Sequence, residues 1–217
     1  MISDVTRAEI TRITGNPLAI EHWTADHLPD GAQLEDYTRK VADTYTVWDS
    51  PHQLFALSWD GEKVEAPALF GLDTAIDPAR YPAVLPGLIA RYLLEHALAP
   101  VARPPIVALC LQIEAHTVER DSLTYQQRRA VANRQMHTLP QAQEKCLCLT
   151  ADIAGRVWWA SKTRGTEESD HGDLATGKPY VGGFADLLVK LAEGLPVFFT
   201  INEHGGRAPD AFGGSGS

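Results

Sequence analysis

The chain has 217 residues, of which 44% are hydrophobic, so it can bury a full core as one large domain or two small ones. Its formal net charge of -9 argues against a general nucleic-acid-binding protein, because neutralising phosphates takes a surplus of Lys and Arg. A protein partner with a basic surface remains compatible with this charge.

The sequence predicts a soluble, cytoplasmic protein. No apolar run approaches the roughly 18 residues of a membrane span. Residues 1–6 contain no basic region followed by an apolar one, which a secretory signal requires. The three cysteines, Cys110, Cys146 and Cys148, lie in apolar runs that resemble strands, so we expect them to be buried and reduced.

The first 120 residues contain a short N-terminal region and one α/β half. Residues 1–30 are predicted as a helix capped by Ser3 and Asp4, followed by an irregular segment. Residues 31–120 form the first half, in the order helix, strand, strand, helix, strand, and Asp60-Gly61 predicts a tight turn between its first two strands. The expected ranges are 34–47, 54–59, 62–66, 83–97 and 106–113.

The second half, residues 121–206, repeats this order of signals. The expected helices and strands cover 123–136, 145–151, 156–161, 181–193 and 197–202. A polar loop is expected over residues 162–178, and residues 207–217 are interpreted as a flexible Gly/Ser-rich tail. We therefore predict an α+β fold of two related α-β-β-α-β halves, the product of an internal duplication, with an extra N-terminal helix.

A resemblance can be stated for residues 145–193. The run C-L-C-L-T-A-D-I-A-G-R-V-W-W from Cys146 to Trp159, followed by an acidic loop and an amphipathic helix, resembles a segment common in uncharacterised proteins of actinobacteria and their phages. The resemblance implies an actinobacterial or phage origin, and for a phage protein a place in the host cytoplasm or the virion. It implies no activity and no catalytic residue.

Two groups of polar residues are candidate sites for chemistry. The loop that contains Asp170, His171 and Asp173 has side chains of the kinds that hold a divalent metal, although it matches no known metal-site spacing, and a solvated loop is the simpler reading. Two His–Glu pairs end corresponding strands of the two halves and are the candidates for a symmetric metal or acid–base site. These are Glu114 with His116, and Glu203 with His204.

Trp158 and Trp159 are candidates for contact with a partner. Neighbouring side chains in a strand point to opposite faces of the sheet, so one of the two is expected to face outward. An outward Trp is costly surface unless another element or a partner covers it. Cover by the loop over residues 162–178 is the alternative.

The chain contains no recognisable catalytic signature, neither a G-x-S-x-G elbow nor a phosphate-binding glycine loop. We therefore predict a non-enzymatic binding or assembly protein that acts through protein–protein contacts or self-association and needs no cofactor. One alternative is an enzyme that uses a divalent metal held by the His and Glu residues at the strand ends. A further alternative is an acidic inhibitor of a host nucleic-acid-binding protein, its charge imitating DNA.

Overall fold

A single antiparallel sheet of six strands forms the centre of the protein. The computed structural model describes residues 28–72, 80–97, 106–119, 121, 123–133, 135–174, 183–192 and 195. The strand order is β2-β1-β3-β4-β5-β6, and every neighbouring pair is antiparallel. The strands are β1 (His52–Trp59), β2 (Val64–Leu72), β3 (Ile106–Thr117), β4 (Gln143–Asp152), β5 (Val157–Thr163) and β6 (Asp170–Asp173).

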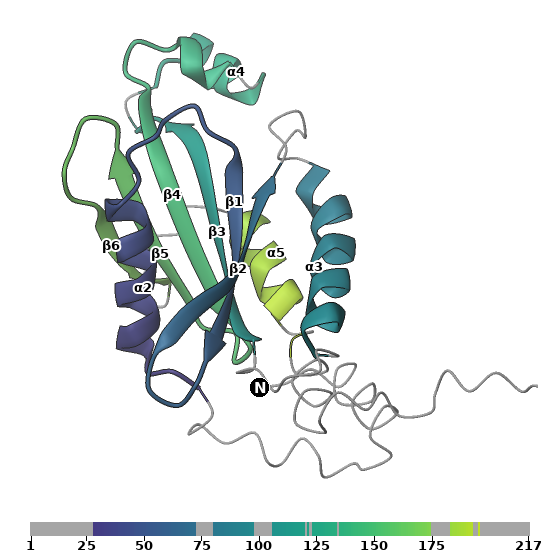
Figure 1. Cartoon of the computed structure of the whole chain (residues 1–217). Helices are drawn as coiled ribbons and strands as arrows, with labels where there is room; N and C mark the ends of the chain where they lie inside the picture. The colour runs from purple at the N-terminus through teal and green to yellow at the C-terminus, as the bar shows by residue number, and fades with distance from the viewer. Residues whose placement is uncertain are drawn as a thin grey trace, which may run out of the picture.

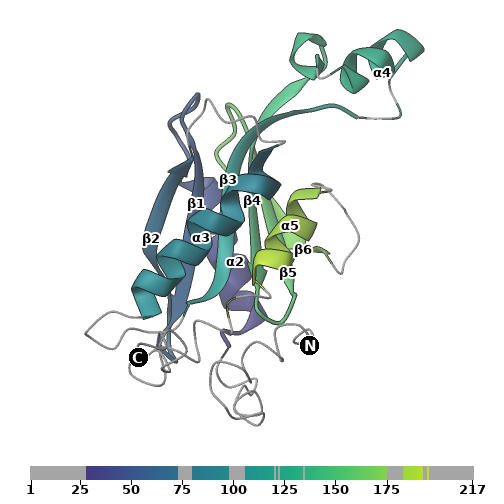
Figure 2. The same ribbon diagram turned by 90° about the vertical axis from the view of Figure 1, so that its right-hand side faces the viewer.

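Helices cover both faces of this sheet. The described helices are α2 (Gly31–Asp43), α3 (Tyr81–Ala97), α4 (Tyr125–Ala132), the short 3₁₀ helix η4 (Met136–Thr138) and α5 (Gly183–Ala192). Figures 1 and 2 show α2 on one face and both α3 and α5 on the other. Helix α2 packs mainly on β4 and β5, which leaves much of β1 and β2 uncovered on its face of the sheet.

Helix α2 is fixed at its start and along its buried side. Asp30 and Gln33 form a reciprocal capping box, which satisfies backbone N–H groups that the first turn leaves free. Leu34, Thr38 and Ala42 are spaced four residues apart and are buried. The buried hydroxyl of Thr38 lies 2.6 Å from the Thr150 hydroxyl on β4, so a polar contact joins the helix to the sheet.

Alternating side chains of the strands build two cores. On the α3 and α5 face, Leu109, Leu111, Leu147 and Leu149 pack with residues of both helices such as Leu188. On the α2 face the core is built around Leu34, Ala42, Cys110, Cys146, Cys148, Trp158 and Ala160. Because both faces are covered, the first eight residues of β3 are all buried, as expected for its continuous apolar run.

The mixed α+β prediction is confirmed, with two differences in detail. The four expected helices are present, and the strands expected before residue 162 are found within a few residues of their expected ranges. Strand β2 extends six residues beyond its expected end at residue 66, to Leu72, and β6 lies inside the 162–178 segment expected to be a polar loop. The expected N-terminal helix and the strand at 197–202 lie outside the described residues.

The described residues do not confirm the duplication. Helix α2 packs against the sheet, whereas its expected counterpart α4 has no buried residue and lies beyond one end of the sheet (Figures 1 and 2). Strand β4 pairs with β3 on one side and β5 on the other. In the first half, β3 pairs with the edge of β1 that faces away from β2. The same strand also pairs with the edge of β4 that faces away from β5, where a repeat of the first half would need a strand of its own. The two halves therefore share β3 within one sheet.

Candidate functional site

A groove lies at the C-terminal end of α2, beside the outer strands that the helix does not cover. Its volume is about 510 Å³, and it lies between the 44–50 loop and the neighbouring residues of β1 and β3. We call it the α2–β1 groove. Its lining residues are Val41, Thr44, Tyr45, Thr46, Val47, Ser50, Gln53, Phe55 and Gln112.

Apolar side chains continue from this groove to the edge of the sheet. Val47 on the loop is 68% exposed, and Leu69 on β2 is 54% exposed. Leu69 lies directly opposite Phe55 in the β1–β2 ladder, so the two side chains share one face of the sheet. Val47, Phe55 and Leu69 therefore form one apolar surface along the open side of the groove.

Polar contacts anchor the far end of the loop. The Tyr45 hydroxyl donates a hydrogen bond to the Glu114 carboxylate, and the Ser50 N–H donates to the same carboxylate oxygen at 3.3 Å. Burial, and after it the Glu114 carboxylate, raises the pKa of Tyr45, so the phenol stays a donor at neutral pH. Asp49, which lies between Tyr45 and Ser50 in the loop, adopts a left-handed backbone conformation with φ 63°, which Asp tolerates better than most residues.

Three carboxylates meet beside this loop. Asp49, Glu114 and Glu144 each offer an oxygen within 4.8 Å of the others, and we call them the carboxylate cluster. Arg164 donates to Glu144 at 2.7 Å and to Asp49 at 3.4 Å, so one guanidinium offsets part of the negative charge. The cluster is a plausible set of ligands for a divalent cation, and equally a network of surface ion pairs.

One of the two expected His–Glu pairs, Glu114 with His116, lies at this cluster. Glu114 belongs to it, and His116 pairs with Glu144 across the β3–β4 ladder. His116 is exposed, and its ring centroid lies 6.0 Å from that of His137. Glu203 and His204 lie outside the described residues, so the expected symmetric site of two His–Glu pairs is not tested.

The other expected metal ligands lie on β6, which runs alongside α2. Asp170 and His171 are exposed on β6, and the His171 Nε2 atom lies 3.8 Å from a Glu35 carboxylate oxygen. Asp173 lines a second cavity of about 580 Å³, which we call the Glu35 pocket. None of these three residues belongs to a ligand cluster among the residues that the structure describes.

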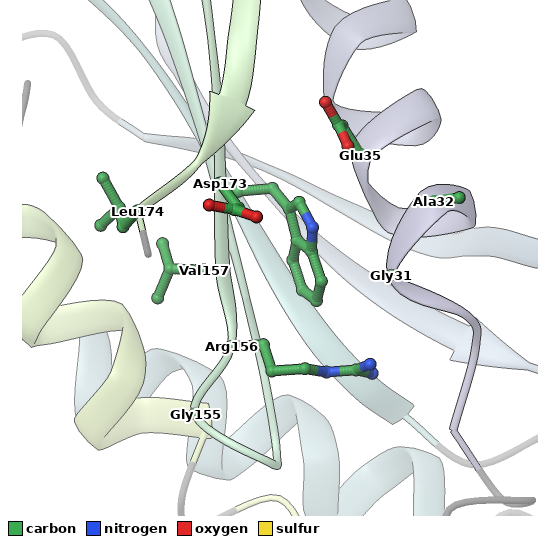
Figure 3. A pocket seen from close by; sticks show the side chains of 9 residues that line it. Gly31, Ala32, Glu35, Gly155, Arg156, Val157, Asp173 and Leu174 are labelled. Atoms are coloured by element: carbon green, nitrogen blue, oxygen red, sulfur yellow. The ribbon is translucent and has the colours of Figure 1, made fainter. Parts of the chain in front are cut away.

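One wall of the Glu35 pocket is polar, and hydrogen bonds hold its Arg156 side chain in place. Figure 3 shows Asp173 and Arg156 on the strand side and Glu35 on α2 across from them. Arg156 donates to the buried Asp152 carboxylate at 2.7 Å and to the Pro29 carbonyl at 3.0 Å. Because these bonds hold the guanidinium over the Trp158 ring, 5.1 Å from its centroid, Arg156 joins the β4–β5 turn to the start of α2.

The two tryptophans face opposite sides of the sheet, as expected, and the chain itself buries both of them. Trp158 is 4% exposed and lies under the first residue of α2, where a Cβ placed on Gly31 would lie 3.5 Å from the indole. Trp159 is 8% exposed and belongs to the core on the α3 and α5 face. Helix α2 packs on β5 over Trp158, and Gly172 of the 162–178 segment lies against the Trp159 indole, where a Cβ on the glycine would lie 3.4 Å from the Nε1 atom.

Most of the groove and cluster residues could not be predicted from local sequence signals. Val47 and Leu69 are ordinary apolar residues in the printed sequence, and only the position of α2 leaves them exposed. Asp49, Glu144 and Arg164 lie in three separate segments that the sheet brings together. Asp49 had one local signal, because an Asp next to Ser50-Pro51 is typical of a turn.

Comparisons with known proteins add no relative. No protein-family model, no curated protein and no solved structure matches this chain. Among the described residues, no helix is both long and apolar enough to cross a membrane. The functional argument therefore depends on the geometry of the sites described above.

Proposed function

We propose that this chain is a non-enzymatic protein-binding protein that acts through the α2–β1 groove. The apolar surface of Val47, Phe55 and Leu69 is the observation that supports the proposal, because two of these side chains are more than half exposed. Contiguous apolar patches with a polar rim mark interaction sites on soluble proteins. The sheet edge beside Leu69 leaves room for a macromolecular partner.

The polar groups of the groove suit binding better than catalysis. They are hydroxyls and side-chain amides, from Thr44, Tyr45, Thr46, Ser50, Gln53 and Gln112. Such groups donate and accept hydrogen bonds without gaining or losing a proton near neutral pH. General acid–base catalysis needs a group that titrates near the working pH. Tyr45 is the one titratable residue among those that line the groove, and burial raises its pKa further above neutrality.

The test compares charge-introducing variants at exposed apolar positions. Val47→Glu and Leu69→Glu each place a carboxylate in the apolar surface, and both positions are exposed enough to leave the core intact. Tyr125→Glu is the matched control, because Tyr125 is 81% exposed on α4, away from the groove. Affinity capture from lysate of the source cells, quantified by mass spectrometry, should give the same partner with wild type and the control. Undiminished capture by both groove variants would exclude the groove.

A metal-dependent activity is the second candidate, favoured by the carboxylate cluster. Three carboxylates of Asp49, Glu114 and Glu144 within reach of one ion could hold Mg²⁺ or Mn²⁺, with His116 nearby as a proton acceptor. Isothermal titration with Mn²⁺ tests the site, and Glu144→Gln is the variant that should weaken binding. Absence of binding to wild type would remove this candidate.

Other expectations from the sequence stay predictions. These are the actinobacterial or phage origin, the cytoplasmic location, the repeat of the two halves and the role of an acidic inhibitor. The inhibitor hypothesis is compatible with the proposed binding role, since its target is also a protein. A partner identified by capture would decide between them.

A further inference from the structure

The α2–β1 groove leads from an apolar surface to a negatively charged end. Val47 and Phe55 line its apolar part, and Tyr45 and Ser50, which line the same groove, contact Glu114 of the carboxylate cluster. Among the described residues, the three carboxylates of the cluster have one guanidinium as a partner, that of Arg164. An occupant that covers the full length of the groove therefore meets apolar side chains first and carboxylates next.

We propose that the groove binds an extended segment of a partner protein in which an apolar residue and a Lys or Arg are spaced four residues apart. This inference depends on the proposed protein-binding function and specifies its partner. The apolar residue packs on Phe55 between Val47 and Leu69. The basic residue reaches the carboxylate cluster and pairs with Asp49, whose side chain is 75% exposed.

The spacing follows from the register of the sheet. Phe55 lies opposite Cys110 and Gln53 opposite Gln112, while Glu114 is two residues further along β3 on the same face. Four residue steps along a strand span about 13 Å, at about 3.3 Å per residue. An extended peptide rises by the same amount per residue, so residues four apart share one face and match both ends of the groove.

The floor of the groove suits a peptide main chain. The half-buried Gln53 and the buried Gln112 line this floor with side-chain amides, between the apolar surface and the carboxylate cluster. A side-chain amide carries both donors and an acceptor, which can pair with the N–H and C=O groups of an extended segment. Gln112 is held in place by a bond of 3.4 Å from its Nε2 to the Val41 carbonyl oxygen.

The negative net charge of the chain disfavours a second copy of the same chain as the occupant of the groove. The chain has a net charge of -9, so two copies repel each other, and the end of the groove is itself negative. A basic segment is attracted by the same charge. Complementary charges of this kind favour one partner over others and raise the rate of association.

The probe is a phage-displayed library of random 12-residue peptides selected on the full-length chain. Enriched peptides should contain an apolar residue and a Lys or Arg four positions apart. For a synthetic enriched peptide, fluorescence anisotropy should show affinity reduced more than about tenfold when its basic residue becomes Glu. Asp49→Asn in the protein should weaken binding about two- to fivefold, as expected for an exposed ion pair, and the control Asp186→Asn should not.

The outcomes separate the two proposals. Peptides that lose binding with Val47→Glu and Leu69→Glu but need no basic residue would overturn the inference and leave the protein-binding function standing. Failure to obtain any peptide whose binding depends on the groove would overturn both. The carboxylate cluster would have no part in recognition if two results were obtained together. The peptide would bind wild type and Asp49→Asn with equal affinity, and replacing its basic residue by Glu would leave its affinity unchanged.

Discussion

The Lys162 ammonium on β5 donates a hydrogen bond to the Asp43 carbonyl oxygen at 2.6 Å, at the last residue of α2. A second bond of 3.1 Å joins it to the Tyr45 carbonyl oxygen in the loop that follows. Lys162 is 7% exposed, and a cation suits the negative end of a helix dipole. Lys162 thus fixes the point where α2 ends and the wall of the groove begins.

Replacing Lys162 tests this anchor. Lys162→Met keeps an unbranched apolar stem and leaves both carbonyl oxygens without this donor, so it should lower the free energy of unfolding by about 1–3 kcal/mol. Urea denaturation monitored by circular dichroism measures the change. The control is Lys40→Met, because Lys40 is exposed and only pairs with Asp36, and it should cost less than about 0.5 kcal/mol. Equal losses in both variants would contradict the anchoring role.

The three cysteines should be unreactive in the folded protein. All three are free and buried, and the Sγ atoms of Cys146 and Cys148 lie 3.9 Å apart. Burial raises the pKa of the Cys110 thiol to about 12 and raises that of Cys148 as well, so these two thiols stay protonated at pH 8. A thiol reagent should label few of them in native protein and all three after denaturation. Rapid native labelling of Cys146 and Cys148 would show that β4 opens readily.

His52 should make stability depend on pH. Burial, partly opposed by the Glu114 carboxylate, lowers the pKa of His52, whose Nδ1 lies 2.5 Å from the Tyr81 hydroxyl. The unfolded chain takes up a proton at this residue near pH 6.5, at which the folded chain holds His52 neutral. The unfolded state therefore binds more protons, and the free energy of unfolding should fall as the pH drops below about 6.5.

The His52→Gln variant isolates this effect. Urea denaturation of wild type and variant at several pH values between 5 and 8 gives the free energy of unfolding at each. The variant should lose less stability than wild type on acidification. An identical pH dependence in both proteins would mean that His52 does not contribute.

Helix α5 offers a paired test of the core on the other face. Leu188 is fully buried in contact with the sheet, and Asp186 on the same helix is exposed. Leu188→Ala should cost about 2–5 kcal/mol, the lost transfer free energy plus the residual cavity. Asp186→Ala should stay within about 0.5 kcal/mol. Small losses in both variants, measured by chemical denaturation, would show that α5 does not pack as described.

Local sequence signals predicted most of the helices and strands. The Asp60-Gly61 turn is present, with Gly61 at φ 99° and the Asp60 carboxylate accepting from the Lys63 N–H at 2.8 Å. The capping box of Asp30 and Gln33 sets the start of α2, and that spacing can be read from the sequence. Strand β6 could not be predicted, because Asp-His-Gly-Asp has no apolar alternation and is a strand through its pairing with β5.

The candidate site was predictable only at Glu114. Its neighbours Asp49 and Glu144 come from the 44–50 loop and β4, and the β3–β4 register that brings Glu144 to His116 cannot be read from composition or spacing. The burial of Trp158 under α2 could not be predicted for a related reason. The alternation rule gives the face of a strand, and it does not say which faces helices cover.

The central claim, that the α2–β1 groove is a protein-binding site, is tested most directly by site-specific photo-crosslinking. A photoreactive amino acid replaces Val47, Leu69 or Tyr125, all exposed, and the protein is irradiated in the cells that produce it naturally. The account predicts that positions 47 and 69 crosslink to the same partner protein and that position 125 does not. Crosslinking at position 125 alone, or no shared product from positions 47 and 69, would contradict it.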